Sequence, residues 1–191
     1  ISIKMTLYRM ARESQIVQAL IEAAENGKEV VALVELRARF DEQNNIDWSK
    51  QLEEAGCTIL YGFDDYKVHS KLTLITKKGP QGYSYITQIG TGNYNEKTSE
   101  LYTDYSFITA DLGIGEEASN VFQNLAVQKL TETTEKMLVA PLRFKSVLLD
   151  EMDRVINAAK LGRPASMILK NNSISDRDII LKLQEASCAG V

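Results

Sequence analysis

The chain has 191 residues, of which 44% are hydrophobic and 25% charged, with a formal net charge of −4. This composition is typical of a folded protein with a core, and it argues against general disorder. The acidic balance argues against a nucleic-acid partner, because binding to the phosphate backbone needs a basic surface. The two cysteines, Cys57 and Cys188, are too far apart for a Cys-rich zinc site, and no apolar run approaches the roughly 18 residues of a membrane span. We therefore expect a cytoplasmic protein with one domain and part of another.

Strands and helices are expected to alternate over the first 61 residues. Apolar runs predict strands at residues 3–8, 30–34 and 57–61. Two amphipathic segments predict helices, one from about residue 16 to Gly27 and one over about residues 41–55. The run at residues 30–34 is continuously apolar, which is typical of a strand buried on both faces of a parallel sheet.

The predicted alternation of strands and helices ends after residue 65. Residues 67–76 and 83–89 are rich in β-forming residues, and the turn-forming segment between them predicts a hairpin. A further strand at 103–109 and a helix at about 115–125 complete the set. We place the first domain at residues 1–125, an α/β domain with a mixed sheet flanked by helices.

The pattern starts again in residues 126–191. Periodicity predicts a long helix at about 142–161, a strand at 165–170 and a helix at 176–186. This order is similar to the opening strand and helix of the first domain, so we interpret residues 126–191 as a connecting helix and a truncated second copy. Generic alternation of strands and helices remains the alternative interpretation.

His69 is the single histidine of the chain and lies two residues before Lys71. If both belong to the strand predicted at 67–76, their side chains share one face. A neutral imidazole is a competent nucleophile, and a neighbouring ammonium can neutralise phosphoryl oxygens. The alternative is a half-exposed strand histidine beside a solvated lysine, which is the commoner case for an isolated His-x-Lys.

A glycine-rich turn, Gly90-Thr91-Gly92-Asn93, follows the second strand of the predicted hairpin. Glycines let the backbone approach a ligand and present amide groups to an anion, and the Asn93 amide can bond phosphate or orient an imidazole. The alternative is an ordinary strand exit. A His-x-Lys strand paired with such a turn is the layout of phospholipase D-type half-sites.

Two arginines are expected near the ends of neighbouring strands. Arg9 ends the first predicted strand, and Arg39 follows the buried strand at 30–34. Ligands of open α/β sheets bind at the carboxyl ends of strands, and a guanidinium suits phosphate oxygens. Either arginine could instead pair with Glu35 or Asp41 at the surface.

Several longer motifs together resemble one enzyme family. The chain is similar, in order and over nearly its whole length, to the first carboxy-terminal domain of bacterial polyphosphate kinases, followed by the opening of their second. The motifs are Thr6-Leu7-Tyr8-Arg9, Val34-Glu35-Leu36-Arg37-Ala38-Arg39-Phe40-Asp41-Glu42, Val68-His69-Ser70-Lys71-Leu72, Ile89-Gly90-Thr91-Gly92-Asn93-Tyr94-Asn95-Glu96-Lys97-Thr98, Leu101-Tyr102-Thr103-Asp104-Tyr105-Ser106 and Leu169-Lys170-Asn171-Asn172.

The resemblance implies a phospholipase D-like fold and reversible transfer of the terminal phosphoryl group of ATP, through a phosphohistidine, to polyphosphate. By motif, His69 is the phosphorylated residue, Arg9 and Arg39 belong to the magnesium-phosphate site, and Tyr102 contacts the nucleotide. Arginine donates hydrogen bonds and does not ligate metals, so we assign the two arginines to phosphates that Mg²⁺ also touches. We add Lys71 and Asn93 on chemical grounds.

The same resemblance implies as partners ATP or ADP, polyphosphate, the remainder of a longer chain and further copies of it, with membrane association left open. The alternative function is a phospholipase D-type phosphodiesterase or nuclease. Those enzymes carry an Asp where this chain has Thr76, which argues against it. A third possibility is a polyanion-binding module without catalysis.

Overall fold

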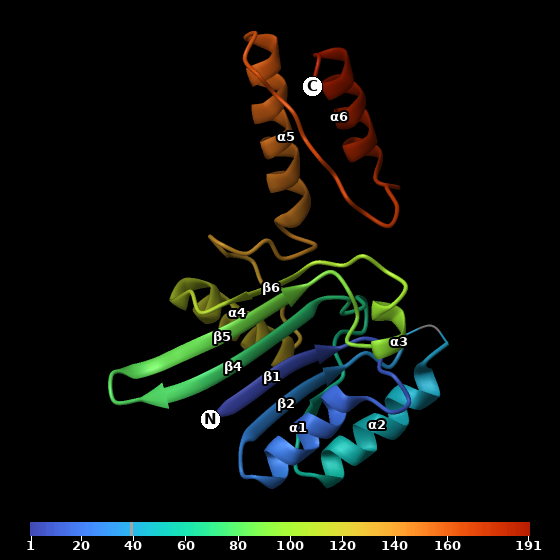
Figure 1. The fold of residues 1–191 in the computed structure, drawn as a ribbon, viewed down its shortest axis with the longest axis vertical. Coiled ribbons are helices and arrows are strands. Elements are labelled where there is room, and N and C mark those ends of the chain that lie inside the picture. The colour runs from blue at the N-terminus through green and yellow to red at the C-terminus, as the bar shows by residue number, and fades with distance from the viewer. Residues whose placement is uncertain (39) are drawn as a thin grey trace. The chain divides into compact units, whose positions relative to one another are not determined.

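The computed structural model describes residues 1–38 and 40–191, so Arg39 lies outside the described residues. The described chain divides into two compact units, Ile1–Thr131 and Glu132–Val191. Figure 1 shows the sheet of the first unit and the two long helices of the second.

The first unit is built on one mixed six-stranded sheet with the order β3-β2-β1-β4-β5-β6. The first three strands are parallel to one another, and β4, β5 and β6 each run antiparallel to the preceding neighbour in that order. The strands are β1 (Ser2–Leu7), β2 (Glu29–Val34), β3 (Thr58–Leu60), β4 (Lys71–Gly79), β5 (Gly82–Gly90) and β6 (Ser106–Thr109). The α/β class and the mixed sheet flanked by helices are confirmed.

Helices α1 (Gln15–Glu25) and α2 (Glu42–Glu54) pack on one face of the parallel half of the sheet. Ser14 caps α1 by accepting a hydrogen bond from the Val17 amide, which satisfies one of the free donors of the first turn. Trp48 of α2 is buried in this core and donates its indole N–H to the Ala11 carbonyl at 2.9 Å. It is the packing anchor that its position in an amphipathic helix suggests.

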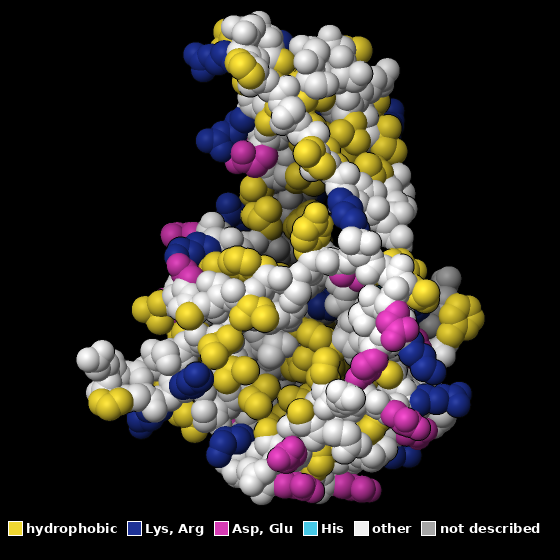
Figure 2. Space-filling view, in the orientation of Figure 1, with side chains coloured by type: hydrophobic (Ala, Val, Ile, Leu, Met, Phe, Trp, Pro, Cys, Tyr) yellow, Lys and Arg dark blue, Asp and Glu magenta, His cyan; other side chains and the backbone are white. Residues whose placement is uncertain are grey.

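Helix α4 (Leu112–Ala126) packs on the antiparallel strands β4 and β5. A Cβ atom at Gly115 would collide with the side chain of Tyr85 on β5, so the glycine permits the close approach of helix and sheet. On the face drawn in Figure 2, charged side chains gather over α1 and α2, whereas hydrophobic side chains are visible over the antiparallel strands.

The strand directions bring several chain segments to one edge of the sheet. Because β1 and β2 are parallel, Leu7 and Val34 are aligned where both strands end. Strand β4 runs the opposite way, so its first residue, Lys71, begins at this edge, and it is paired with Gly90 at the end of β5. The segments that follow β1, β2 and β5 and the segment that precedes β4 therefore meet there.

Several predicted boundaries were wrong. Strand β4 begins at Lys71 and not at residue 67, because residues 61–70 form a loop, so His69 precedes the strand. Strand β6 begins at Ser106 instead of 103, since a short helix, α3 (Glu96–Ser99), and the loop after it occupy the preceding stretch. Asn95 caps α3 by accepting hydrogen bonds from the amides of Lys97 and Thr98 through its side chain.

The second unit contains helices α5 (Phe144–Lys160) and α6 (Arg177–Cys188), which pack against each other. The strand predicted at 165–170 is wrong: these residues form no secondary structure, consistent with the absence of a strand partner within the described unit. Exposed ion pairs link the two helices, including Lys160 with Glu185 and Lys182 with Asp153. Among the described residues, no helix has the length and apolar character to cross a membrane.

Candidate phosphoryl-transfer site

Four side chains converge at the edge of the sheet where β1 ends and β4 begins. Tyr8 and Arg9 directly follow β1, His69 lies in the loop before β4, and Lys71 is the first residue of β4. Thr6 ties the two segments together: its hydroxyl donates to the Ser70 carbonyl at 2.8 Å and accepts from the Leu72 amide at 3.0 Å. Antiparallel pairing of β1 and β4 thus places the histidine loop beside the end of β1.

His69 and Lys71, which were predicted to share one face of a strand, lie in contact. The Lys71 ammonium lies 3.0 Å from Nδ1 and 3.2 Å from Nε2 of the imidazole, and it donates to the His69 carbonyl at 2.6 Å. The reason differs from the prediction, because His69 is not in the strand. The lysine side chain instead turns back over the loop, where it is only 4% exposed.

The environment of His69 keeps its imidazole neutral. Partial burial, followed by the positive charges of Lys71 and Arg9, lowers the pKa of His69 below its usual value. Each of these causes penalises the protonated form. One ring nitrogen therefore carries a lone pair at neutral pH.

Lys71 is shifted in the same direction. Burial is the largest cause and Arg9 adds to it, while the negative charge of Asp104 opposes them; together they lower the pKa of Lys71 to about 8. The amine is still mostly protonated at neutral pH. It can therefore offer a positive charge to a phosphoryl group from a site that is largely shielded from water.

Tyr8 was not predicted as a site residue. Its ring lies edge-on to His69, with ring centroids 4.4 Å apart and an interplanar angle of 72°. The Lys71 ammonium and the Arg9 guanidinium lie 5.2 and 5.7 Å from the centre of the same ring. Its place next to Arg9 at the end of β1 was the available signal, because that edge also receives the histidine loop.

Arg9 lies at this edge, as expected from the end of the first strand. Its Nε forms an ion pair with Asp41 at 3.2 Å, and the side chain is 35% exposed. The alternative that we considered for Arg9, a pairing with Asp41, is thus observed. The predicted convergence of Arg9 with Arg39 stays a prediction, because Arg39 lies outside the described residues.

The glycine-rich turn forms one wall of a cavity of about 420 Å³ at the same edge. The cavity is lined in part by Thr73, Gly90 and Asn93, and Gly90 is the strand partner of Lys71. The side-chain oxygen of Asn93 is buried without a hydrogen-bond partner among the described residues. An unsatisfied buried acceptor is uncommon in folded proteins, and here it lies beside an open cavity.

Tyr102 lies in the loop after α3 and is 58% exposed. Among the described residues, no group of three or more His, Cys, Asp or Glu side chains could hold a metal ion.

Comparison with known proteins identifies both units. Residues 1–131 match the family model described as polyphosphate kinase C-terminal domain 1, and residues 137–191 match C-terminal domain 2. Over its entire length the chain is 46% identical to a protein named polyphosphate kinase from Staphylococcus saprophyticus and 44% identical to one from Lactiplantibacillus plantarum. It spans 27% of the length of each of these relatives.

A solved structure gives the same result for the fold. The chain superimposes over its whole length on the crystal structure of polyphosphate kinase from Porphyromonas gingivalis, with a TM-score of 0.86 and 36% sequence identity. The aligned region covers 32% of that protein. The similarity therefore extends over every element described above and corresponds to about a third of that chain.

Proposed function

Because this chain belongs to the polyphosphate kinase family, we propose that it supplies the phosphohistidine half of the catalytic centre of a longer polyphosphate kinase. In this proposal His69 accepts the terminal phosphoryl group of ATP and passes it to the end of a polyphosphate chain. The observation that carries the proposal is the contact of a neutral imidazole with a buried ammonium at the edge where β1 ends and β4 begins.

The two transfers balance in atoms and charge. A ring nitrogen of His69 attacks the γ-phosphorus of ATP, the bond from that phosphorus to the bridging oxygen breaks, and ADP leaves. A terminal oxygen of polyphosphate then attacks the same phosphorus, the N–P bond breaks, and the imidazole is restored. Both steps are reversible, so the same site supports synthesis and breakdown.

Lys71 stabilises the charge that develops in both transfers. Its ammonium is close enough to the imidazole to exchange a ring nitrogen for a phosphoryl oxygen without moving far. Because the site is largely shielded from water, a charge there acts more strongly than an exposed one. Transfer of phosphoryl groups depends mainly on such positioning and charge stabilisation.

The remaining site residues hold the substrates. Arg9 and Arg39 grip phosphate oxygens, Asn93 offers its side chain at the cavity, and Tyr102 contacts the nucleotide. Mg²⁺ bound to the phosphates would add charge neutralisation. Arg9 must share its guanidinium between Asp41 and phosphate, and its outer nitrogens suit the second task.

We propose that residues 126–191 begin a second phospholipase D-like copy, and that the site also uses residues from the rest of a longer enzyme, which forms oligomers. The 191-residue chain alone should then show no turnover, because groups that act as a unit lose most of their effect when separated. An assay of this chain for ATP-dependent chain elongation tests the statement, and robust turnover would contradict it.

The decisive experiment looks for the covalent intermediate. The full-length enzyme is incubated with ATP, and intact-mass and peptide analysis locate an acid-labile phosphate. We expect the phosphate on His69 and its loss in both His69→Gln and His69→Asn, with chain elongation reduced at least about 1000-fold. Substantial elongation by either variant, or a phosphate located elsewhere, would contradict the assignment.

A further inference from the structure

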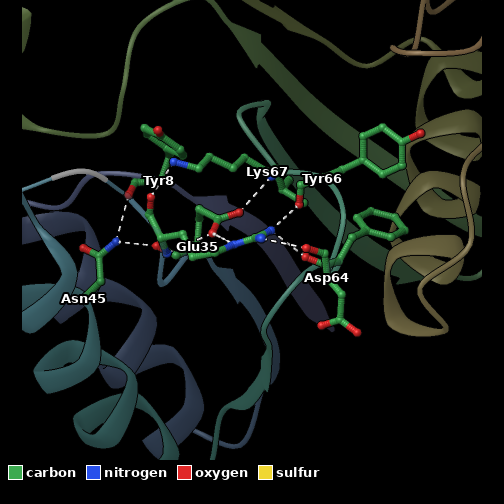
Figure 3. Close-up of polar contacts among 9 residues, drawn as sticks. Tyr8, Glu35, Asn45, Asp64, Tyr66 and Lys67 are labelled. Carbon is green, nitrogen blue, oxygen red and sulfur yellow. Dashed lines mark hydrogen bonds and ion pairs between the residues drawn. The ribbon is translucent and has the colours of Figure 1, made fainter.

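A buried carboxylate underlies the loop that carries His69. Glu35 follows β2 directly and is 1% exposed. Its two oxygens accept hydrogen bonds from backbone amides of two segments: Oε1 from Arg37 and Oε2 from Val68, both at 2.9 Å. Figure 3 shows Glu35 between these segments. Val68 directly precedes His69, so the carboxylate holds the backbone next to the imidazole.

Arg37 grips the same loop through its carbonyls. The guanidinium donates to the carbonyl oxygens of Phe63 and Asp64 at 2.7 Å and of Tyr66 at 2.8 Å. Its Nε also lies 3.6 Å from the Glu35 carboxylate. The planar fork of arginine can satisfy several acceptors at fixed angles, which a lysine cannot reproduce. Three carbonyls of a loop without secondary structure are therefore fixed by one side chain (Figure 3).

The loop contributes contacts in return. Lys67 donates to the carbonyl oxygen of Arg37 at 2.9 Å, which closes the connection from the loop side. Gly62 has a φ of +76°, and a Cβ atom there would lie 3.3 Å from the side chain of Val68. The loop thus begins near a glycine whose backbone conformation suits glycine best. It ends at Val68, whose amide donates a hydrogen bond to the Glu35 carboxylate.

The segment after β2 is itself anchored to the end of β1. Asn45 of α2 is fully buried and donates to the carbonyls of Tyr8 at 2.8 Å and Glu35 at 2.9 Å. The backbone of Tyr8, whose ring contacts His69, and the backbone of Glu35 are therefore held by one amide. One connected set of hydrogen bonds joins β1, the segment after β2 and the histidine loop.

We infer that Glu35 and Arg37 are positioning residues for His69: together they hold residues 62–68 so that the imidazole lies against Lys71 and Tyr8. Neither residue touches the imidazole. They act through the backbone on the N-terminal side of His69, while Thr6 donates a hydrogen bond to the Ser70 carbonyl on the C-terminal side. The role in catalysis rests on the proposed function, whereas the role in placing the ring does not.

The ring position can be measured directly, because His69 is the single histidine of this chain. In the ¹⁵N-labelled 191-residue protein, one set of imidazole signals reports its pKa and surroundings. Tyr8, Arg9 and Lys71 face the ring. Arg37→Gln and Glu35→Gln should release the loop, so the imidazole becomes hydrated and its pKa rises toward the ordinary value of about 6.5.

Matched controls are the same substitutions at exposed positions outside this network: Glu54→Gln in α2 and Arg154→Gln in α5. Both should leave the histidine signals at their wild-type positions. Arg37 is about half exposed, so Arg37→Gln keeps the test valid should Glu35→Gln unfold the chain. Arg37→Lys retains the positive charge but loses the planar guanidinium. Its imidazole signals should therefore lie between those of Arg37→Gln and the wild type.

Kinetics of the full-length enzyme supply the second readout. We expect kcat to fall about 10- to 100-fold in Arg37→Gln, as for misplacement of a reacting group, with KM for ATP within about twofold. Wild-type imidazole signals in a folded Arg37→Gln protein would overturn the inference, whatever the activity. Failure to find phosphohistidine in the wild type would instead overturn the proposed function and leave the ring measurement decisive for the positioning role.

Discussion

Lysines of the two units lie in surroundings that shift their pKa in opposite directions. In the second unit, Lys145 lies 2.8 Å from Asp176 and 2.6 Å from Asp178, and hydrogen bonds to these carboxylates raise its pKa. In the first unit, Lys71 is buried beside an imidazole, and burial lowers its pKa to about 8. One charge is placed where it is favourable, the other where it is costly.

This difference distinguishes lysines that form surface ion pairs from a lysine that lies in a candidate functional site. Exposed ion pairs such as those between α5 and α6 contribute little energy each, and their loss is tolerated. A cation held in a desolvated place near another cation, Arg9, opposes stability, and groups of this kind cluster at functional sites. In the first unit, the hydrogen bonds of Glu35 and Arg37 with the histidine loop keep His69 beside the buried Lys71 despite this cost.

Among substitutions of the lysines compared here, the largest expected effect comes from Lys71→Met, which removes the costly charge and keeps a similar volume. We expect kcat of the full-length enzyme to fall about 100- to 1000-fold, as when one stabilising donor is lost. Thermal stability of the 191-residue chain at pH 7 should be unchanged or higher, because a desolvated ammonium is gone. Lys182→Met is the control. Activity within tenfold of wild type, or a large loss of stability, would contradict the comparison.

A smaller effect is expected from Arg9→Lys. The charge is preserved, but the outer guanidinium nitrogens that we assign to phosphate are lost. Loss of one charge-assisted hydrogen bond corresponds to about a tenfold decrease in kcat/KM for ATP. Arg154→Lys is the matched control, and steady-state kinetics of the full-length enzyme measure both. An unchanged kcat/KM in Arg9→Lys would show that Arg9 serves only its ion pair with Asp41.

The lowered pKa of His69 predicts a dependence of stability on pH. As the pH falls through about 6.5, the unfolded chain takes up a proton on His69 before the folded chain does, so stability decreases. At higher pH both states carry neutral imidazole and the contribution is constant. Melting temperatures of wild type and His69→Gln between pH 5 and pH 8 test this. Their difference should change on the acidic side only; a constant difference would contradict the lowered pKa.

The smallest effect is expected in the second unit. Lys182→Met breaks partly exposed ion pairs with Asp153 and Glu185, and the melting temperature should change by no more than about 2 °C. Most of this change should disappear at 1 M salt, where exposed charges are screened. Lys145→Met serves as a second test of the same kind. A larger, salt-independent loss would show that the ion pairs between α5 and α6 are structural requirements.

Much of the fold was predictable because local patterns and tertiary structure agree. The continuous apolar run became the buried strand β2, and the amphipathic periods became α1, α2, α5 and α6. The expected strand at 165–170 failed because apolar residues alone do not form a strand without a partner. The strand expected at 67–76 was shortened because backbone groups of its first residues bond to the side chains of Glu35 and Thr6 instead of the backbone of a neighbouring strand.

For the site, residue types and their spacing were enough to predict the chemical groups: one histidine, a lysine two residues later and an arginine at the end of the first strand. Their meeting was decided by the tertiary structure, because antiparallel pairing of β1 with β4 brings residues more than 60 positions apart to one edge. The roles of Tyr8, Glu35 and Arg37 were also decided there. Burial and backbone contacts give these residues their function, and neither can be read from residue types and spacing alone.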